Sequence, residues 1–228
     1  YYSQKSIRSL EDYSVHYKVN LKNPNPLFEL FAPTVYVAKN SRIDGTFTGG
    51  YTSILSINTQ PDTVFLGRDK FFENELQINI SKVADSTNVL AMVFLGSNNQ
   101  LISGVETRDL FFEGIWNNNH IDFEFDIDQV KYSNYARLYG EVDFLTNETV
   151  IHFNPSDLSI LDKFWFVNDK NLISISENEI SISNLSISSG EQFISLNGFI
   201  SPDPDKILFT NMENVQLENL NTIISQNL

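Results

Sequence analysis

The chain has 228 residues and a formal net charge of -14, and 41% of its residues are hydrophobic. That hydrophobic content suffices for a folded domain and excludes a disordered chain. The charge is concentrated after residue 114, where it reaches -12. So acidic a surface repels phosphate groups and argues against nucleic-acid binding. There are no cysteines, which excludes disulfides, thiol nucleophiles and thiolate metal sites.

Segments in which hydrophobic and polar residues alternate recur along the whole chain. Successive side chains of a strand point to opposite faces, so this alternation predicts strands with one apolar and one polar face. Asn, Gly, Asp, Ser and Pro separate the segments and predict turns. The sequence therefore predicts an all-β, mostly antiparallel protein, with strands at 13–22, 41–50, 74–82, 89–96, 110–116, 120–129, 135–144, 172–176, 179–183, 185–189 and 193–200.

Helix signals are few. Pro26 and Pro33 bracket NPNPLFELFAP and predict one or two helical turns there. Asp157 is a candidate cap for a single turn over DLSILDKFW, and the tail LENLNTIISQNL is either a short helix or a frayed end. No linker divides the chain, so we expect one continuous unit over 1–228, with frayed ends at 1–12 and 221–228. Because the chain opens on Tyr1, we expect it to be a fragment of a longer protein.

One face of the predicted sheet is apolar, and its side chains are the candidate functional surface. In VLAMVFLG, the alternation selects Leu90, Met92 and Phe94. Gly45, Gly114, Gly140 and Gly198 also fall on this face, where they indicate either a bend with close approach of the chain or clear space for a long ligand. The candidate lining residues are Val15, Tyr17, Val19, Ile43, Phe47, Leu76, Ile78, Ile80, Leu110, Phe112, Ile121, Phe123, Phe125, Ile127, Leu138, Val142, Ile180, Ile182 and Leu196.

The segment HIDFEFDIDQ shows the two faces most clearly. Asp122, Glu124, Asp126 and Asp128 alternate with its hydrophobic residues and form an acidic row. Clustered carboxylates can bind calcium or cleave glycosides, but a strand spaces these about 7 Å apart and leaves them in water. The pattern favours a solvated face over calcium binding or catalysis.

No catalytic or metal-binding motif accompanies these strands. The three histidines, His16, His120 and His152, form no i, i+4 pair, and no carboxylate lies at metal-ligand spacing from two of them, so we expect solvent-facing side chains and no metal site. There is no nucleophile elbow, phosphate-binding glycine loop or dinucleotide fingerprint. We therefore expect a protein without enzymatic activity or cofactor.

Two long passages resemble one family of bacterial envelope proteins. VHYKVNLKNPNPLFELFAPTVYVAKNSRIDGTFTGG has a strand, an Asn-Pro turn, a short Leu/Phe helix and a strand with G-x-F. LDKFWFVNDKNLISISENEISISNLSISSGEQFISLNGFISPDP combines a Trp segment, strand pairs, an ISLNG strand and an Asp/Pro loop. The order and combination of their motifs are similar to those of the TamB (AsmA-like) translocation and assembly proteins of the Bacteroidetes type. The resemblance spans residues 14–220.

The resemblance implies a fold and a function. The fold would be a long sheet folded into a taco-like groove with an apolar lining. The parent protein would be anchored in the inner membrane outside this fragment and cross the periplasm to the outer membrane. The expected partners are phospholipid or fatty acyl chains, carried between membranes, and an outer-membrane assembly barrel, in keeping with a role in outer-membrane biogenesis. The carried-over site is the apolar lining itself.

Two other functions are compatible with the residues. A closed β-sandwich for carbohydrate binding or adhesion would need exposed aromatics, and Tyr132, Tyr135 and Tyr139 are the available platform, although strand tyrosines are common in cross-strand packing. A scaffold that lends an edge strand to a folding barrel would need an unprotected sheet edge.

Overall fold

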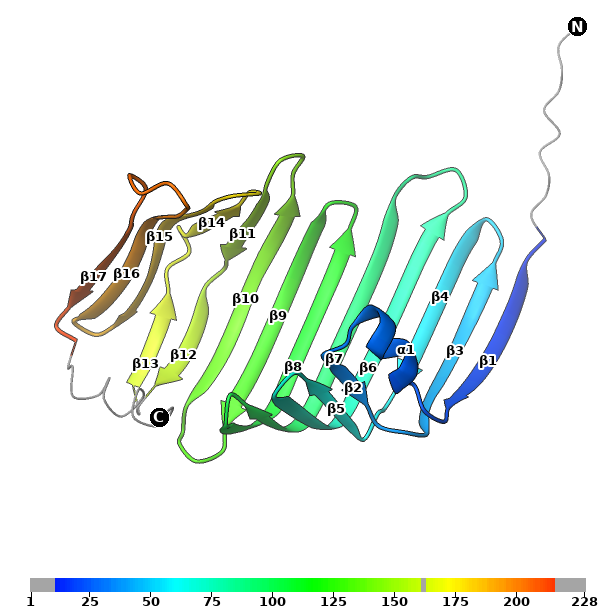
Figure 1. The fold of residues 1–228 in the computed structure, drawn as a ribbon. Coiled ribbons are helices and arrows are strands. Elements are labelled where there is room, and N and C mark those ends of the chain that lie inside the picture. Colours follow the sequence, from blue (N-terminus) through cyan, green and yellow to red (C-terminus); the bar gives the residue numbers. More distant parts are fainter. Residues whose placement is uncertain (1–10, 161–162, 216–228) are drawn as a thin grey trace, which may run out of the picture.

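All seventeen strands of the described residues belong to one antiparallel sheet (Figure 1). The computed structural model describes residues 11–160 and 163–215. Most strands lie beside one another in chain order, from β1 at one end to β17 at the other. The all-β, antiparallel prediction is therefore confirmed.

The strands differ greatly in length, and those in the middle of the chain are longest. Their bounds are β1 (Tyr13–Leu21), β2 (Val35–Val37), β3 (Ser41–Gly49), β4 (Thr52–Thr59), β5 (Thr63–Leu66), β6 (Asp69–Val83), β7 (Val89–Ile102), β8 (Val105–Asn117), β9 (His120–Gln129), β10 (Tyr135–Phe144), β11 (Thr149–Phe153), β12 (Ser156–Ile160), β13 (Lys163–Val167), β14 (Leu172–Ile175), β15 (Ile180–Ser189), β16 (Gln192–Ile200) and β17 (Leu208–Glu213).

The pairing follows a meander with three places where a long strand changes partner. From β1 the sheet runs through β3, β4, β6, β7, β8 and β9 to β10. Strand β6 pairs first with β5 and then with β4. Strand β10 pairs with both β11 and β12, and β15 pairs with both β13 and β14. Strand β16 then pairs with β15, and β17 pairs with β16.

Side chains replace the missing backbone hydrogen bonds where partners change. The amide of Asn171, which is 2% exposed, accepts from the backbone N–H of Phe153 and donates to its carbonyl, each over 2.8 Å. At the break between β11 and β12, the hydroxyl of Ser156 accepts from the N–H of Tyr139 over 2.9 Å. Buried backbone groups must find partners, so these polar residues keep one sheet continuous across its interruptions.

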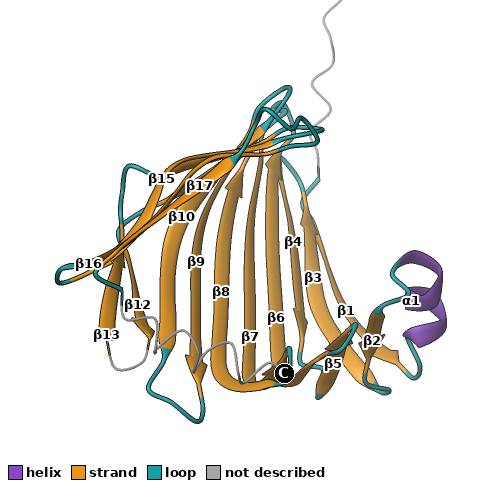
Figure 2. Cartoon of the chain, turned by 60° about the vertical axis from the view of Figure 1, so that its left-hand side comes forward, coloured by secondary structure: helices purple, strands orange, loops and turns teal. Residues whose placement is uncertain are grey.

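Left-handed residues mark the same kind of irregularity. Glu73 has φ of 52° where β6 passes from one partner to the other, and Asn184 has φ of 54° at a register shift between β15 and β16. Asp109 has φ of 52° within a shift between β8 and β9. Bulges of this kind bend a sheet and increase its twist. Figure 2 shows β15, β16 and β17 crossing obliquely past the upright strands around β8.

The first helix prediction is confirmed and the second is wrong. Helix α1 (Asn25–Phe31) has a proline in its first turn and adjoins β2 (Figure 2). The described residues of that segment belong to β12 and β13 instead, where Leu158 pairs with Trp165 and two apolar side chains share one side of the sheet. The predicted tail helix, at residues 217–228, lies outside the described residues.

Candidate functional site

Strand pairing aligns the apolar residues of many strands on one face of the sheet. Phe123 of β9 lies opposite Gly114 of β8 and Gly140 of β10, while Phe125 lies opposite Phe112 and Leu138. Register partners in an antiparallel sheet share a face. One apolar row can therefore be followed from β1 through β9 to β16, and we call it the apolar face.

Every candidate lining residue lies on this apolar face. In the N-terminal part, Val15 pairs with Phe47, and Ile80 is connected to Phe47 through β4. In the C-terminal part, Ile182 is connected to Val142 through β11 and β14. The structure thus brings together residues that are far apart in the sequence, and the positions so placed are Val15, Tyr17, Val19, Ile43, Phe47, Leu76, Ile78, Ile80, Leu110, Phe112, Ile121, Phe123, Phe125, Ile127, Leu138, Val142, Ile180, Ile182 and Leu196.

Very few hydrophobic side chains are buried among the described residues. The buried ones are Ala91, Leu110, Trp165, Val167 and Ile182, and all five belong to the apolar face. Other large side chains of the same face remain open to solvent, and these include Tyr13, Val15, Val19, Leu95, Trp116, Phe144, Ile200 and Met212. Exposed apolar side chains that share one face of a sheet are a feature of ligand and partner sites.

The prediction for strand β7 was wrong by one residue. Leu90, Met92 and Phe94 lie on the opposite, polar face, where Phe94 pairs with Glu113. Val93 and Leu95 occupy the apolar face instead. Both sets in this strand are hydrophobic, so alternation alone cannot choose between them, and the neighbouring strands set the register.

Strand β4 was missed altogether, although it carries two apolar-face residues. Leu55 pairs with Phe47 and Ile80, and Ile57 pairs with Gly45 and Ile78. The adjacent hydrophobic residue Ile54 blurs the alternation in this segment. The period-2 positions of Leu55, Ile57 and Thr59 are the signal that could have identified the strand.

Neighbouring groups fill the space beside three glycines of the apolar face. A Cβ atom at Gly45 would lie 2.3 Å from the ring of Tyr17, and one at Gly140 would lie 2.6 Å from the ring of Phe123. Gly198 has φ of 116°, where a Cβ atom would lie 2.2 Å from the carbonyl oxygen of Ile207. Close approach is therefore the reason for these glycines, and the alternative of clear space for a ligand is wrong at these three positions.

An apolar hollow of about 180 Å³ lies on the apolar face between β10 and β16. Only Ser186 among its lining residues is polar; the others are Leu138, Phe153, Val167, Leu185, Ile187, Ile194 and Leu196. Phe153 also meets Phe123 edge to face, with ring centroids 6.0 Å apart. The hollow offers an apolar ligand contact without a hydrogen-bonding requirement.

The acidic row of β9 lies on the polar face, as predicted, but it is not uniformly solvated. Arg137 of β10 contacts Asp126 at 3.4 Å and Asp128 at 2.6 Å. The carboxylates of Asp126 and Asp128 are only about one quarter exposed, in contrast to 65% for Asp122. Desolvation raises the pKa of Asp126, against the opposing effect of Arg137. Arg137 thus compensates two partly buried charges.

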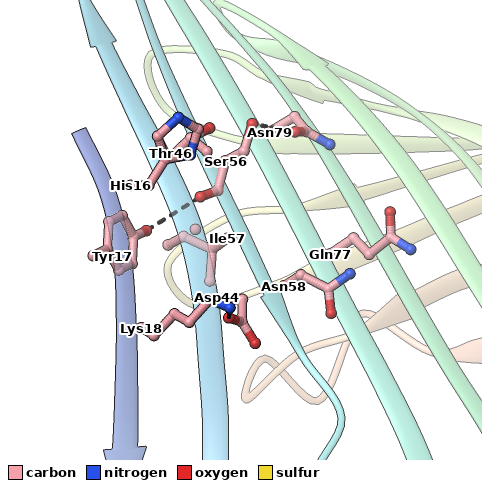
Figure 3. Close-up of a pocket in the computed structure, with 11 residues that line it drawn as sticks. His16, Tyr17, Lys18, Asp44, Thr46, Ser56, Ile57, Asn58, Gln77 and Asn79 are labelled. Carbon is pink, nitrogen blue, oxygen red and sulfur yellow. Dashed lines mark hydrogen bonds and ion pairs between the residues drawn. The ribbon is translucent and has the colours of Figure 1, made fainter. Parts of the chain in front are cut away.

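A polar depression of about 350 Å³ opens near the N-terminal end of the sheet (Figure 3). Tyr17 donates a hydrogen bond to the carbonyl of Ser56 over 3.1 Å at its margin. Asp44 contacts Arg42 at 2.7 Å and Lys18 at 3.8 Å, and the hydrogen bond from Arg42 lowers the pKa of Asp44. Exposed ion pairs such as these contribute little to stability.

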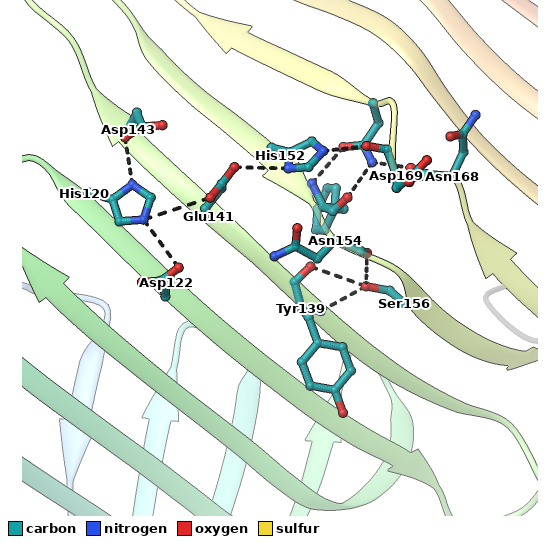
Figure 4. A network of polar contacts seen from close by, with 12 residues as sticks. His120, Asp122, Tyr139, Glu141, Asp143, His152, Asn154, Ser156, Asn168 and Asp169 are labelled. Carbon is teal, nitrogen blue, oxygen red and sulfur yellow. Dashed lines mark hydrogen bonds and ion pairs between the residues drawn. The ribbon is translucent and has the colours of Figure 1, made fainter.

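Two histidines meet carboxylates on the polar face of β9, β10 and β11 (Figure 4). His120 lies 2.8 Å from Asp143 through Nδ1 and 3.3 Å from Asp122 through Nε2. Glu141 lies between the two rings, 4.0 Å from His120 Nε2 and 3.2 Å from His152 Nδ1. The hydrogen bond with Asp143 is the main cause that raises the pKa of His120.

Spacing along the chain does not reveal this cluster. Its members become neighbours because Asp122 pairs with Glu141, His120 with Asp143, and Glu141 with His152. His16, by contrast, stays on the polar face of β1 and lines the depression of Figure 3. All three histidines lie on the polar face, but His120 and His152, which are 34% and 25% exposed, make carboxylate contacts that were not predicted from the sequence.

Comparison of the chain with protein-family models, curated proteins and solved structures finds no match. The resemblance to TamB-like proteins therefore stays a prediction. Within the part of the chain that the structure describes, no helix has the length and apolar character needed to cross a membrane.

Proposed function

We propose that the apolar face binds the acyl chains of phospholipid or fatty acid. The main support for this proposal is that apolar residues align across the sheet and that few of them are buried. A folded protein normally covers such a face with a second layer, yet few hydrophobic side chains of the described residues are buried. In this proposal the sheet forms the wall of a groove, and lipid covers the apolar side chains.

The energetics favour a long, flexible, apolar ligand. Each buried methylene contributes about 0.8 kcal/mol, so an acyl chain gains affinity in proportion to the length of wall that it contacts. Neighbouring strands lie about 4.8 Å apart. A face that continues from β1 to β16 can thus offer an uninterrupted apolar path across many strands.

The polar face suits the aqueous side of such a wall. It carries the acidic row of β9 and contributes to a net charge of -14. These charges would keep the protein soluble and away from anionic membrane surfaces. A lipid headgroup could remain in water, so the proposal requires no polar pocket on the apolar face.

The wider role follows from the resemblance and is part of the same proposal. The chain would be one segment of a periplasmic path for phospholipid between the inner and outer membranes, in a parent protein anchored in the inner membrane. The end strands β1 and β17 each pair on one side only among the described strands. Such edges could join further strands of a longer groove or meet an outer-membrane assembly barrel.

One observation favours carbohydrate binding as a second candidate. Phe164 and Phe166 of β13 are each 60% exposed, and Tyr139 of β10 is 37% exposed. Tyr135 lies near Phe164, with ring centroids 6.4 Å apart, and Arg137 lies over its ring at 4.9 Å. This aromatic group could stack on sugars, but it is much smaller than the apolar face.

Photocrosslinking at adjacent positions tests the lipid proposal. Trp116 and Asn117 are neighbours in β8 that point to the apolar and polar faces, respectively. With benzoylphenylalanine at position 116, we expect ultraviolet light to attach phospholipid to the protein in bacterial cells, because Trp116 is 48% exposed on the apolar face. Position 117 is the matched control. Equal lipid labelling at both positions, or none at position 116, would contradict the proposal.

A further inference from the structure

The strongest chemical cluster outside the apolar face surrounds His120. The Nε2 atom of His120 and one carboxylate oxygen each from Asp122 and Glu141 lie within 4.8 Å of one another. They come from the neighbouring strands β9 and β10, which hold them at fixed register positions. One nitrogen and two anionic oxygens therefore converge on a single point (Figure 4).

Further contacts orient the convergent atoms. Asp143 accepts a hydrogen bond from Nδ1 of His120 over 2.8 Å, so whenever the ring is neutral with its proton on Nδ1, the Nε2 lone pair faces Asp122 and Glu141. His152 approaches the other oxygen of Glu141 at 3.2 Å, and its own Nε2 donates to the carbonyl of Asp169 over 2.6 Å. A carboxylate that holds the far nitrogen of an imidazole is the usual support of a metal-binding histidine.

We propose that His120, Asp122 and Glu141 bind a divalent transition-metal ion such as zinc. Two ligands of a tetrahedral zinc ion, each about 2.0–2.2 Å from the metal, lie about 3.3–3.5 Å apart. The contact of 3.3 Å between His120 and Asp122 matches this separation, and the 4.0 Å to Glu141 needs only a small side-chain adjustment. Water would complete the coordination.

The donor set selects the class of cation. Calcium and magnesium take oxygen ligands, whereas imidazole favours zinc, copper, iron and nickel. Three carboxylates, those of Asp122, Glu141 and Asp143, surround one imidazole in this cluster. A divalent ion between the strands would neutralise two of these charges and cross-link β9 to β10. The expectation of no metal site was based on the spacing of residues along the chain. That spacing does not reveal ligands that come from different strands.

Calorimetric titration of the tag-free protein with zinc chloride tests the site. We expect one saturable site per chain in the wild type. His120→Gln and Glu141→Gln remove a ligand, and Asp143→Asn should weaken binding about 10- to 100-fold by loss of orientation. The matched control is His16→Gln, which alters a histidine on the same face outside the cluster. Circular dichroism verifies that each variant is folded.

The outcomes separate clearly. Weaker zinc binding in the His120, Glu141 and Asp143 variants, with wild-type affinity in the His16 variant, supports the site. Absence of saturable binding in the wild type overturns it, as does unchanged affinity in Glu141→Gln and Asp143→Asn. Calcium chloride serves as a second probe, and calcium binding as tight as that of zinc would contradict the assigned class of cation.

Discussion

Replacing Gly140 by alanine should lower the free energy of unfolding by about 2–3 kcal/mol, at the upper part of the range for overpacking. The added Cβ atom would lie 2.5 Å from the backbone carbonyl oxygen of His152 and 2.6 Å from the ring of Phe123. The ring could rotate away, but the carbonyl belongs to β11, which pairs with β10 at this position. The strain must therefore be relieved by the backbone.

Urea unfolding measures this effect, and Gly96→Ala is the matched control. Gly96 also lies within a long strand, but a Cβ atom there would meet only the end of the Phe94 ring, at 3.3 Å. Alanine also reduces the entropy of the unfolded chain, so we expect Gly96→Ala to change stability little. Equal unfolding midpoints for the two variants would contradict the close packing at Gly140.

Replacing Leu95 and Trp116 by glutamine should weaken the binding of a fluorescent fatty acid at least tenfold. These side chains are 37% and 48% exposed on the apolar face and are available to a ligand without unfolding the sheet. Contact with a large apolar side chain contributes about 1.5–3 kcal/mol when fully buried, and 1.4 kcal/mol corresponds to a tenfold change in affinity. Partial contact at both positions is enough for this loss.

The polar face provides the matched control for this pair. Met92 and Leu90 are 41% and 48% exposed, and both lie on the polar side of β7. Their double replacement by glutamine removes a similar exposed apolar area from the other face. We expect it to leave fatty-acid affinity unchanged. If both double variants lose affinity equally, general surface hydrophobicity rather than the apolar face governs binding.

The sequence predicts the fold class and most of the apolar face because alternation is a local property. A strand such as β9 has four hydrophobic residues on one side, and the four side chains therefore lie in the same environment. The same rule fails in β7, where Met92 and Val93 are both hydrophobic and only pairing with β6 and β8 decides between them. Local pattern also fails after Asp157. The helix cap predicted there is a weak signal, and the segment instead forms β12, which pairs with β10.

The histidine cluster could not be predicted, because it depends on register across strands. Glu141 and His152 are eleven residues apart, and His120 and Asp143 are twenty-three apart. Neither separation is a sequence motif. Only the lengths of the hairpins between β9, β10 and β11 bring these residues side by side, and hairpin length determines register.

The most direct test of acyl-chain binding is mass spectrometry of an organic extract from the purified protein. We expect phospholipid or fatty acid to co-purify with the wild type, and Phe123→Asp and Leu138→Asp to reduce its amount in fractions verified as folded. Both positions lie on the apolar face, and Leu138 lines the apolar hollow. A well-folded wild-type protein free of lipid would contradict acyl-chain binding and direct attention to sugar binding at Tyr135 and Tyr139.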